Sequence, residues 1–369
     1  FVAIYAFVAG IAFFAPADDA SYIIKGESIE AVAAAVNAVG GEITHELGII
    51  NAVAATLNDA QRAALESKHS DLQISEDGEV KTASGTAGGA PGPYAHFPSL
   101  VNADDVHSQG ITGQSVTVAV LDSGMAAIAE LKKDTYGVER TLRRYNSITD
   151  LEGSHLDKYG HGTHVASIIL NTDYADDGSM RRNSIAPDVR SVPVKAFDKN
   201  GSGSYANVIR GLDWILAHRD EYNIRVLNLS FSAPARSHYW DDPINQAVMQ
   251  LWQAGVVVVA SAGNNGPDPM SIGVPGNNPY VITVGAMSDN YTPADPSDDV
   301  LASFSSAGPT VEGFVKPEIV APGGHMVART RVKSTIAKTH PEFHDYDKYF
   351  TMSGTSQAAA VVSGVAALI

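Results

Sequence analysis

The stretch TVAVLD (Thr117–Asp122) is an apolar run that ends on an acid and is followed by Ser123-Gly124. Similar apolar runs recur further along the chain, at SVPVKAF (191–197), RVLNLSF (225–231), GVVVVAS (255–261) and YVITVGA (280–286). Stretches with helical spacing, such as HVASIIL (164–170) and ANVIRGLDWILAHR (206–219), fall between these runs. Near-continuous apolar runs suit strands that are buried on both faces of a parallel sheet. The sequence therefore predicts an α/β domain built on a doubly wound parallel sheet.

Polar motifs stand where such strands end or where the following helices begin. Asp122 ends the first run, and His161 opens HGTHVAS at the start of an apolar helix. Asn264 lies in SAGNNG just past GVVVVAS, and Ser356 lies in SGTSQAAAVV at the start of the last helix. Open α/β sheets bind ligands outside the carboxyl ends of their strands. We expect these four side chains to form one site.

Each of these residues has a plainer interpretation when it is taken alone. Asp122 and Ser356 are typical helix caps, and Asn264 beside Asn265-Gly266 is typical of a turn. The spacing of His161 and His164 permits a metal site, but no third ligand with suitable spacing accompanies them. The joint occurrence of an acid, a base, a hydroxyl and an amide is what favours catalysis.

These four residue types are the ones that acyl transfer requires. A serine hydroxyl is a poor nucleophile at neutral pH and needs an adjacent base, here His161, to take its proton. Asp122 would hold the imidazole tautomer and stabilise the imidazolium. The amide of Asn264 and the backbone N–H of Ser356 would bind the negative oxygen of the tetrahedral intermediate. The sequence thus predicts a serine hydrolase.

The motifs around these residues resemble those of the subtilisin family. The chain order Asp122, His161, Ser356 is that of subtilisin, and it differs from the order in chymotrypsin and in α/β-hydrolases. The family patterns D-S-G, H-G-T-H-V-A, A-G-N and G-T-S are matched at 122–124, 161–166, 262–264 and 354–356, and FSSAGPTVEGFVKPEIVAPGG (304–324) is similar as well. The resemblance covers about residues 95–369. It implies a subtilisin-like catalytic domain in which Asn264 donates to the oxyanion.

The resemblance also implies which residues bind an extended substrate. In the family, two segments flank the substrate and hydrogen-bond to its backbone. Here they correspond to Gly201, Ser202 and Gly203 and to Ser230, Phe231 and Ser232. Three positions depart from the family pattern: Ser167 and Ser232 replace Gly, and Ala360 replaces Pro. None removes a catalytic group, but Ser232 is expected to narrow the specificity cleft.

The N-terminal part of the chain predicts export and a small accessory domain. Residues 1–17 read as a partial signal peptide that ends in Ala15-Pro16-Ala17, although a membrane anchor is the alternative. Residues 19–78 show the order β-α-β-β-α-β of a small ferredoxin-like α+β module, with a capping box at Asn58. By resemblance this module is an inhibitory propeptide that assists folding, and an unrelated small domain is the alternative. Residues 79–94 are a Gly/Pro-rich linker in which self-cleavage is expected.

Composition limits the partners and cofactors of the chain. Its 369 residues contain no cysteine, which excludes disulfides and thiolate metal sites. A formal net charge of -16 argues against nucleic acid as a partner. We expect polypeptide substrates, the chain's own propeptide as inhibitor, and no stable membrane association after signal cleavage. No cofactor is expected for catalysis; the resemblance allows structural calcium, without assigned ligands, and the acidic loop at Asp173, Asp176 and Asp177 more simply predicts a solvated loop.

The sequence as a whole predicts a secreted serine endopeptidase that is made as a self-processed zymogen. Its catalytic domain (95–369) is expected to be C-terminally truncated, because the chain stops at GVAALI within the helix of Ser356. The alternative is a catalytically silent secreted binding protein on the same scaffold. A third interpretation is a hydrolase of esters, although the propeptide and the extended cleft segments favour peptides.

Overall fold

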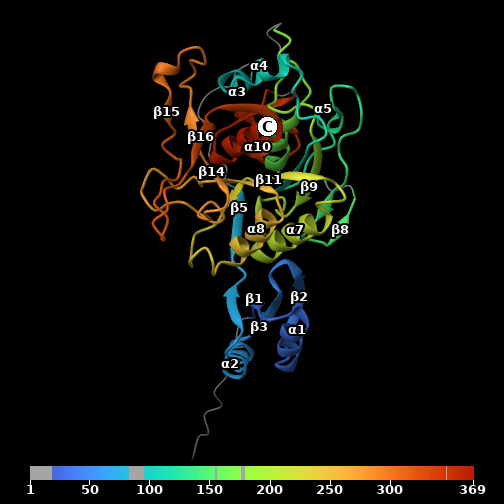
Figure 1. Cartoon of the computed structure of the whole chain (residues 1–369), viewed down its shortest axis with the longest axis vertical. Coiled ribbons are helices and arrows are strands. Elements are labelled where there is room, and N and C mark those ends of the chain that lie inside the picture. Colours follow the sequence, from blue (N-terminus) through green and yellow to red (C-terminus); the bar gives the residue numbers. More distant parts are fainter. Residues whose placement is uncertain (1–18, 83–94, 154–155, 176–178, 346) are drawn as a thin grey trace, which may run out of the picture. The chain divides into compact units, whose positions relative to one another are not determined.

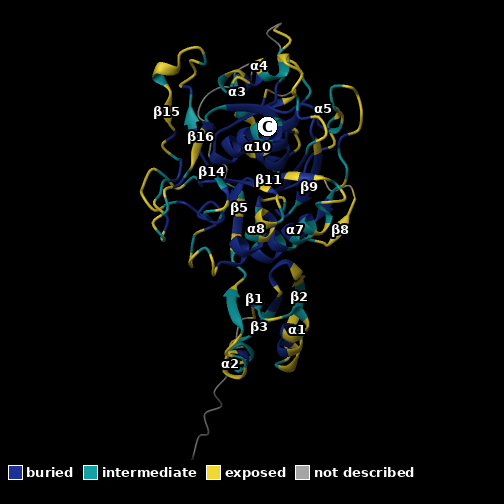
Figure 2. Cartoon of the chain, in the orientation of Figure 1, coloured by how far each residue is buried: buried dark blue, intermediate teal, exposed yellow. Residues whose placement is uncertain are grey.

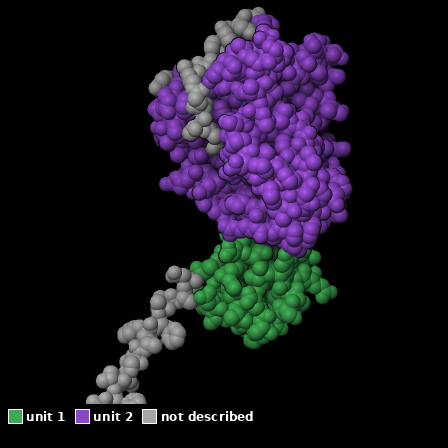
Figure 3. All heavy atoms as spheres, turned by 90° about the vertical axis from the view of Figure 1, so that its left-hand side faces the viewer, with its two compact units in different colours: residues 1–46, 51–77 green, residues 47–50, 78–369 purple. Residues whose placement is uncertain are grey.

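The computed structural model of the chain describes residues 19–82, 95–153, 156–175, 179–345 and 347–369. The chain divides into two compact units (Figure 3). Unit 1 comprises residues up to 46 together with 51–77, and unit 2 comprises residues 47–50 and 78–369. The predicted signal peptide (1–17) lies outside the described residues, as does most of the predicted linker.

Unit 1 has the element order that the sequence predicts. Its elements are β1 (Ala20–Lys25), α1 (Ile29–Ala38), β2 (Glu42–Leu47), β3 (Ala52–Leu57), α2 (Asp59–Lys68) and β4 (Gln73–Glu76). The strand order is β2-β3-β1-β4, and β1 pairs antiparallel with β3 and β4. The predicted capping box begins α2: Asn58 Oδ1 accepts from Gln61 N–H, and Gln61 Oε1 accepts from Asn58 N–H, both at 2.9 Å. The helices pack an apolar face against this sheet, which forms a core separate from that of unit 2.

Unit 2 is built on a central parallel sheet, as predicted. Its main strands are β6 (Thr117–Asp122), β9 (Arg190–Lys195), β11 (Ile224–Leu229), β13 (Val257–Ser261), β14 (Ile282–Ser288) and β16 (Ile319–Pro322). They run parallel, and short antiparallel strands close the edges: β15 (Val300–Leu301) pairs with β14, and β8 (Leu151–Glu152) pairs with β7 (Tyr145–Asn146). Every residue of β6 is buried, which explains its unbroken apolar sequence (Figure 2).

The strand order places a topological switch point beside β6. The chain passes from β6 to its neighbour β9, and then returns to β11 on the other side of β6. A switch of this kind leaves a crevice outside the carboxyl ends of the strands. Asp122 is the last residue of β6 and therefore opens onto that crevice.

Helices cover both faces of the sheet. They are α6 (His161–Leu170) and α10 (Thr355–Leu368), which pack against each other, and α7 (Tyr205–His218) and α8 (Pro243–Gln253), which do the same. Figure 1 shows α10 on one side of the sheet and α7 with α8 on the other. Shorter helices are α3 (Phe97–Leu100), α4 (Ala103–Ser108), α5 (Ala129–Lys132) and α9 (Thr335–Thr339). The predicted doubly wound subtilisin-like architecture is confirmed.

Two smaller sheets lie beside the central one. The hairpin of β17 (Met326–Arg329) and β18 (Tyr349–Met352) leads directly into α10. In the other sheet, β5 (Glu79–Thr82) lies between β10 (Ser202–Ser204) and β12 (Phe231–Ser232) and pairs antiparallel with both. The first four residues of the predicted linker thus form a strand of unit 2, because two strand edges from distant segments supply its hydrogen bonds. Residues 83–94 lie outside the described part of the chain.

None of the helices described in the structure combines the length and the apolar character that crossing a bilayer requires.

Candidate active site

The first two predicted residues form a buried acid–base pair. His161 Nδ1 lies 2.9 Å from both carboxylate oxygens of Asp122, and neither side chain is exposed. Asp122 Oδ1 also accepts the backbone N–H of Ser123 at 2.6 Å. An imidazole that donates from Nδ1 has its other nitrogen available as a base. His161 Nε2 is buried and has no hydrogen-bond partner among the described residues.

Close packing between β6 and α6 holds this pair together. A Cβ atom on Gly162 would lie 2.2 Å from the carbonyl oxygen of Gly124, so only glycine fits at that point of the helix. The Gly162 N–H instead donates to the hydroxyl of Ser123 at 2.9 Å. Gly160, with φ of 111°, supplies the left-handed turn that starts the helix. The sequence H-G-T therefore brings His161 against the end of β6.

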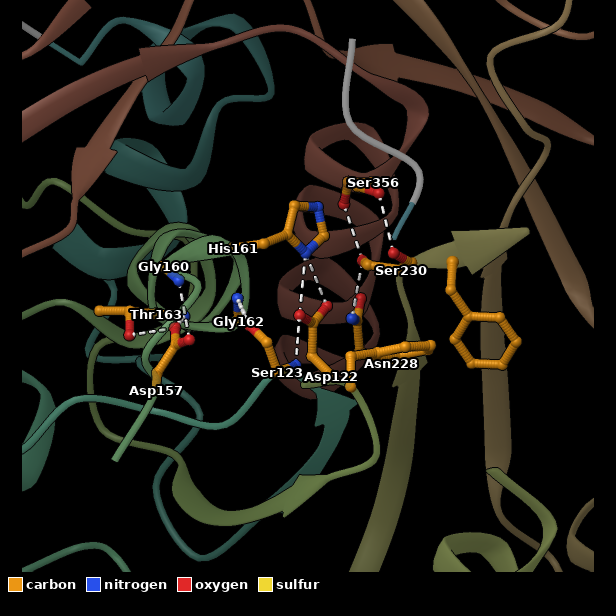
Figure 4. A network of polar contacts seen from close by, with 12 residues as sticks. Asp122, Ser123, Asp157, Gly160, His161, Gly162, Thr163, Asn228, Ser230 and Ser356 are labelled. Atoms are coloured by element: carbon orange, nitrogen blue, oxygen red, sulfur yellow. Dashed lines mark hydrogen bonds and ion pairs between the residues drawn. The ribbon is translucent and has the colours of Figure 1, made fainter. Parts of the chain in front are cut away.

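The predicted nucleophile is the second residue of α10. Ser356 is fully buried, and its hydroxyl donates to the carbonyl oxygen of Ser230 at 2.9 Å. The Ser230 hydroxyl donates in return to the carbonyl oxygen of Ser356, also at 2.9 Å. Figure 4 shows the imidazole of His161 between the Asp122 carboxylate and Ser356. The structure thus brings acid, imidazole and hydroxyl together, with the Ser356 hydroxyl bonded to Ser230 instead of His161.

The predicted amide donor lies beside the nucleophile. Asn264 follows β13, and its Oδ1 accepts both the N–H and the hydroxyl of Thr355, each at 3.0 Å. These two donors fix which end of the amide is the oxygen. The opposite end, Nδ2, is buried and has no partner among the described residues. Helix α10 begins at Thr355, so its N-terminus lies next to this amide, and both are groups suited to a negative oxygen.

The predicted substrate-binding residues lie along the two strands that flank β5. Ser202 and Gly203 pair with Lys81 and Val80, and Thr82 N–H donates to the Gly201 carbonyl oxygen at 3.2 Å. On the other side, Phe231 and Ser232 pair with Thr82 and Lys81.

The side chains of this second strand differ in their surroundings. The Phe231 ring is buried against Phe197, with 5.4 Å between ring centroids, so only its backbone faces β5. The Ser232 hydroxyl is buried without a partner among the described residues, close to Gly263 and Gly273. The Ser232 hydroxyl therefore packs against the backbone of these two glycines.

His164 is a packed histidine. Its ring is fully buried, and Nε2 donates to the carbonyl oxygens of Met326 and Phe350, 3.1 and 2.9 Å away. Burial lowers the pKa of His164 to about 3, so the ring is neutral. The metal-site alternative for His161 and His164 has no support here.

Of the three acidic residues in the loop after α6, the structure describes only Asp173. Asp173 accepts the Tyr349 hydroxyl at 2.8 Å and pairs with Arg329 at 3.5 Å, while Asp176 and Asp177 lie outside the described residues. Within the described ranges no three acidic, histidine or cysteine side chains form a metal-binding group.

Two of the three residues that depart from the family motif, Ser167 and Ala360, are buried in helices of unit 2. The Ser167 hydroxyl accepts the N–H of Arg329 at 2.9 Å and so ties α6 to β17. Ala360 is fully buried within α10.

Three residues that support the site were not predicted. Asp157 caps the first turn of α6, and Lys195 Nζ donates to the carbonyl oxygens of Ser123 and Phe197, at 2.8 and 2.6 Å. Asn228 Nδ2 donates to the Ser230 hydroxyl at 2.9 Å. The available signals were an acid shortly before the HGTH motif and a single lysine and a single asparagine inside apolar strands.

Comparison with known proteins relates this architecture to a family. A model of the subtilase family matches residues 113–369. Serine protease AprX of Bacillus subtilis (strain 168) is 37% identical over 268 residues, which cover 71% of this chain and 58% of AprX. Subtilisin E of the same organism is 31% identical over 333 residues, which cover 89% of this chain and 73% of subtilisin E.

A solved structure has the same fold. Fervidolysin from Fervidobacterium pennivorans, described as a keratinolytic enzyme related to subtilisin, superposes with a TM-score of 0.71 at 23% identity. The match covers 95% of this chain and 54% of fervidolysin, so this chain spans little more than half the length of fervidolysin and of AprX. Because the family model matches most of unit 2, including the segments of Asp122, His161, Asn264 and Ser356, the chain belongs to the subtilase family.

Proposed function

We propose that this chain is a secreted serine endopeptidase that hydrolyses peptide bonds through an acyl-enzyme on Ser356. The observation that carries the proposal is the convergence of a buried Asp122–His161 pair, the Ser356 hydroxyl and the unpartnered Asn264 amide at one edge of the sheet. Its family and its similarity to AprX and subtilisin E support the same reaction class.

Attack begins when the Ser356 hydroxyl turns from the Ser230 carbonyl to His161 Nε2, which has no other partner among the described residues. Nε2 takes the proton as the oxygen bonds to the peptide carbonyl carbon, and Asp122 stabilises the imidazolium that forms. His161 then protonates the leaving amine and the C–N bond breaks. A water molecule, deprotonated by His161, hydrolyses the ester and restores the Ser356 hydroxyl.

Negative charge develops on the carbonyl oxygen in both tetrahedral intermediates. Asn264 Nδ2 supplies one hydrogen bond to it, and the N-terminus of α10 supplies another from the Ser356 N–H. Thr355 holds the Asn264 amide in this orientation before substrate arrives. Such preorganised donors need no rearrangement at the moment of reaction.

Unit 1 is, in this proposal, the inhibitory propeptide of a self-processed zymogen. Strand β5 pairs on both edges as an extended substrate would, and it follows unit 1 directly in the chain. Thr82 pairs with Phe231, whose neighbour Ser230 accepts the Ser356 hydroxyl. Strand β5 ends at Thr82. We therefore place the cut in the segment that follows this strand, within residues 83–94.

The test is the intact mass of the expressed chain beside that of its Ser356→Ala variant. Self-processing predicts that only the parent loses unit 1 and strand β5 (or what remains of them after signal removal), and sequencing should give a new N-terminus within residues 83–94. Both chains should fold, because the substitution removes one oxygen atom. A parent that stays whole and does not react with a fluorophosphonate probe would support the silent binding protein and contradict the peptidase.

A further inference from the structure

Asp157 caps the helix that carries His161, although it lies outside that helix. Its Oδ1 accepts the Gly160 N–H at 2.8 Å, and its Oδ2 accepts the N–H and the hydroxyl of Thr163 at 2.9 and 2.7 Å. Figure 4 shows these contacts beside the catalytic pair. Gly160 has no side chain with which to cap the helix, so this carboxylate, only 3% exposed, takes the place of a side-chain cap.

The same network reaches the segment that follows Asp122. The Thr163 hydroxyl donates to Asp157 and accepts the N–H of Ala126 at 3.0 Å. Asp157 is thus joined through one side chain to both partners of the catalytic pair: the turn that carries His161 and the loop that leaves β6. A shift of this carboxylate would move the imidazole relative to Asp122 and Ser356.

A half-buried cation lies beside the pair. Lys195 pairs with Asp122 in the neighbouring strand β9, and burial lowers the pKa of its ammonium group, opposed first by Asp157 and then by Asp122. The charged and titratable groups near the pair are Asp122, Asp157, Lys195, Asp198, Lys158, His164 and the ring of Tyr159, 6.5 Å from that of His161. His164 is neutral.

We propose that Asp157 is a positioning residue for the reaction: it fixes the His161 ring between Asp122 and Ser356, and its negative charge stabilises the imidazolium formed during attack. The proposal rests on the peptidase function above. It assigns Asp157 no contact with substrate and makes two separable claims, one about geometry and one about charge.

The experiment compares Asp157→Asn with the parent chain, using kcat, KM and the pH profile of kcat/KM on a peptide substrate. An asparagine at position 157 offers only one acceptor oxygen, and its amide NH₂ group would face one of the backbone N–H groups that the carboxylate now accepts. The His161 ring should then be held less well, so kcat should fall about 10- to 100-fold. KM should stay within about twofold. Loss of the negative charge should move the acidic limb of kcat/KM to lower pH, since a nearby carboxylate favours the charged imidazolium.

Two further variants separate these claims from simple destabilisation. Thr163→Val keeps the N–H bond and the charge of Asp157, so it should lower kcat by about threefold to tenfold without moving the pH limb. Asp188→Asn is the matched control, because Asp188 is a buried carboxylate that accepts the Thr135 N–H at 2.8 Å away from the catalytic pair. It should lower the melting temperature and leave kcat and the pH profile unchanged.

The outcomes are distinct. If Asp157→Asn melts lower but keeps the parental kcat and pH limb, as Asp188→Asn should, the proposal is wrong. If Asp157→Asn does not fold, an unchanged kcat in Thr163→Val overturns the geometric claim by itself. A parent chain without activity would contradict the peptidase function instead of the role of Asp157.

Discussion

The side-chain oxygen of Asn264 accepts both the backbone N–H and the hydroxyl of Thr355, each at 3.0 Å. Thr355 immediately precedes Ser356, so the same short segment carries the proposed nucleophile and orients the amide. The Asn264 Nδ2 group is consequently the end of the amide left without a partner among the described residues, as the proposed oxyanion donor requires.

Asn264→Ala should therefore lose a bond that forms only as charge develops. We expect kcat to fall by about 10²- to 10³-fold with little change in KM. This is the usual effect of removing one hydrogen-bond donor to the oxyanion. Steady-state kinetics on a peptide substrate checks this. A rise in KM with kcat unchanged would instead assign Asn264 to ground-state binding.

Thr355→Val provides the control for this orientation. The variant keeps the backbone N–H bond to Asn264 and loses the hydroxyl bond, together with the contact from Gly263 N–H at 3.2 Å. We expect a fall in kcat of about tenfold or less, smaller than that of Asn264→Ala. Equal losses in the two variants would mean that the amide cannot hold its direction without the hydroxyl.

Gly162→Ala tests the close approach of α6 to β6. The new Cβ would lie 2.2 Å from the Gly124 carbonyl oxygen, which is backbone and cannot turn aside. We expect the helix to shift, with a loss of stability of about 1 to 3 kcal/mol and a lower kcat. Thermal melts and kinetics measure both effects.

Gly137→Ala is the comparison for that variant. Gly137 has a positive φ, 82°, whereas Gly162 is helical, and nothing lies within 4 Å of a Cβ added to Gly137. It should cost about 1 kcal/mol of backbone strain and leave kcat unchanged. A Gly162→Ala enzyme as active and stable as Gly137→Ala would show that the helix tolerates the methyl group.

His164 makes stability depend on pH in the acid range. Burial lowers its pKa from 6.5 to about 3, so the folded state binds fewer protons than the unfolded state between these values. The stabilisation is complete above pH 6.5 and is lost as the pH falls toward 3. By pH 4 the loss amounts to about 3 kcal/mol. His164→Gln keeps an N–H donor for the Met326 and Phe350 carbonyls but does not titrate.

The measurement for His164 is the free energy of unfolding between pH 7 and pH 4 for both chains. The variant should start lower at pH 7 because glutamine packs less well, and it should lose less on acidification. Parallel curves would mean that other groups account for the acid sensitivity.

Ser232→Gly tests the wall of the cleft. The Ser232 hydroxyl lies 3.1 Å from the position of a Cβ on Gly263, in the strand that pairs with β5. Removing the side chain should widen the cleft, so kcat/KM for substrates with a large residue before the cut should rise relative to those with alanine. A change of about tenfold is expected, since a methylene in a pocket is worth about 1 to 3 kcal/mol. An unchanged ratio across a peptide series would remove Ser232 from the specificity determinants.

Much of the fold could be predicted because buried strands and helix starts leave local signals. The runs at 117–122 and 191–197 became β6 and β9 within about two residues. The motifs named Asp122, His161 and Ser356, which the fold brings together, and their catalytic roles stay a prediction. The run at 225–231 was only partly right. The chain leaves the central sheet at Ser230, where the backbone turns to meet Ser356, and continues as β12 in a different sheet.

What the sequence did not reveal depends on partners far away in the chain. The sequence of β5, EVKT, belongs to a segment that predicts a linker. It forms a strand because β10 and β12 lie on both sides of it and pair with it. Asp157 gave no periodic signal, since its three bonds serve another element. Lys195 places a charged group in an apolar strand. Its ammonium group is stabilised by the carbonyl oxygens of Ser123 and Phe197, which only the folded chain brings together.

Helix α10 has a consequence for how the enzyme would lose activity. It is buried along nearly its whole length, and it contacts α6 and strands β11, β13, β14 and β16 (Figure 2). The turn that carries Ser356 lies in the fully buried part of the helix, so it cannot open without the core around it. Amide hydrogens of residues 355–364 should exchange only in global unfolding of unit 2, and heating should abolish turnover in a single sharp step that coincides with melting.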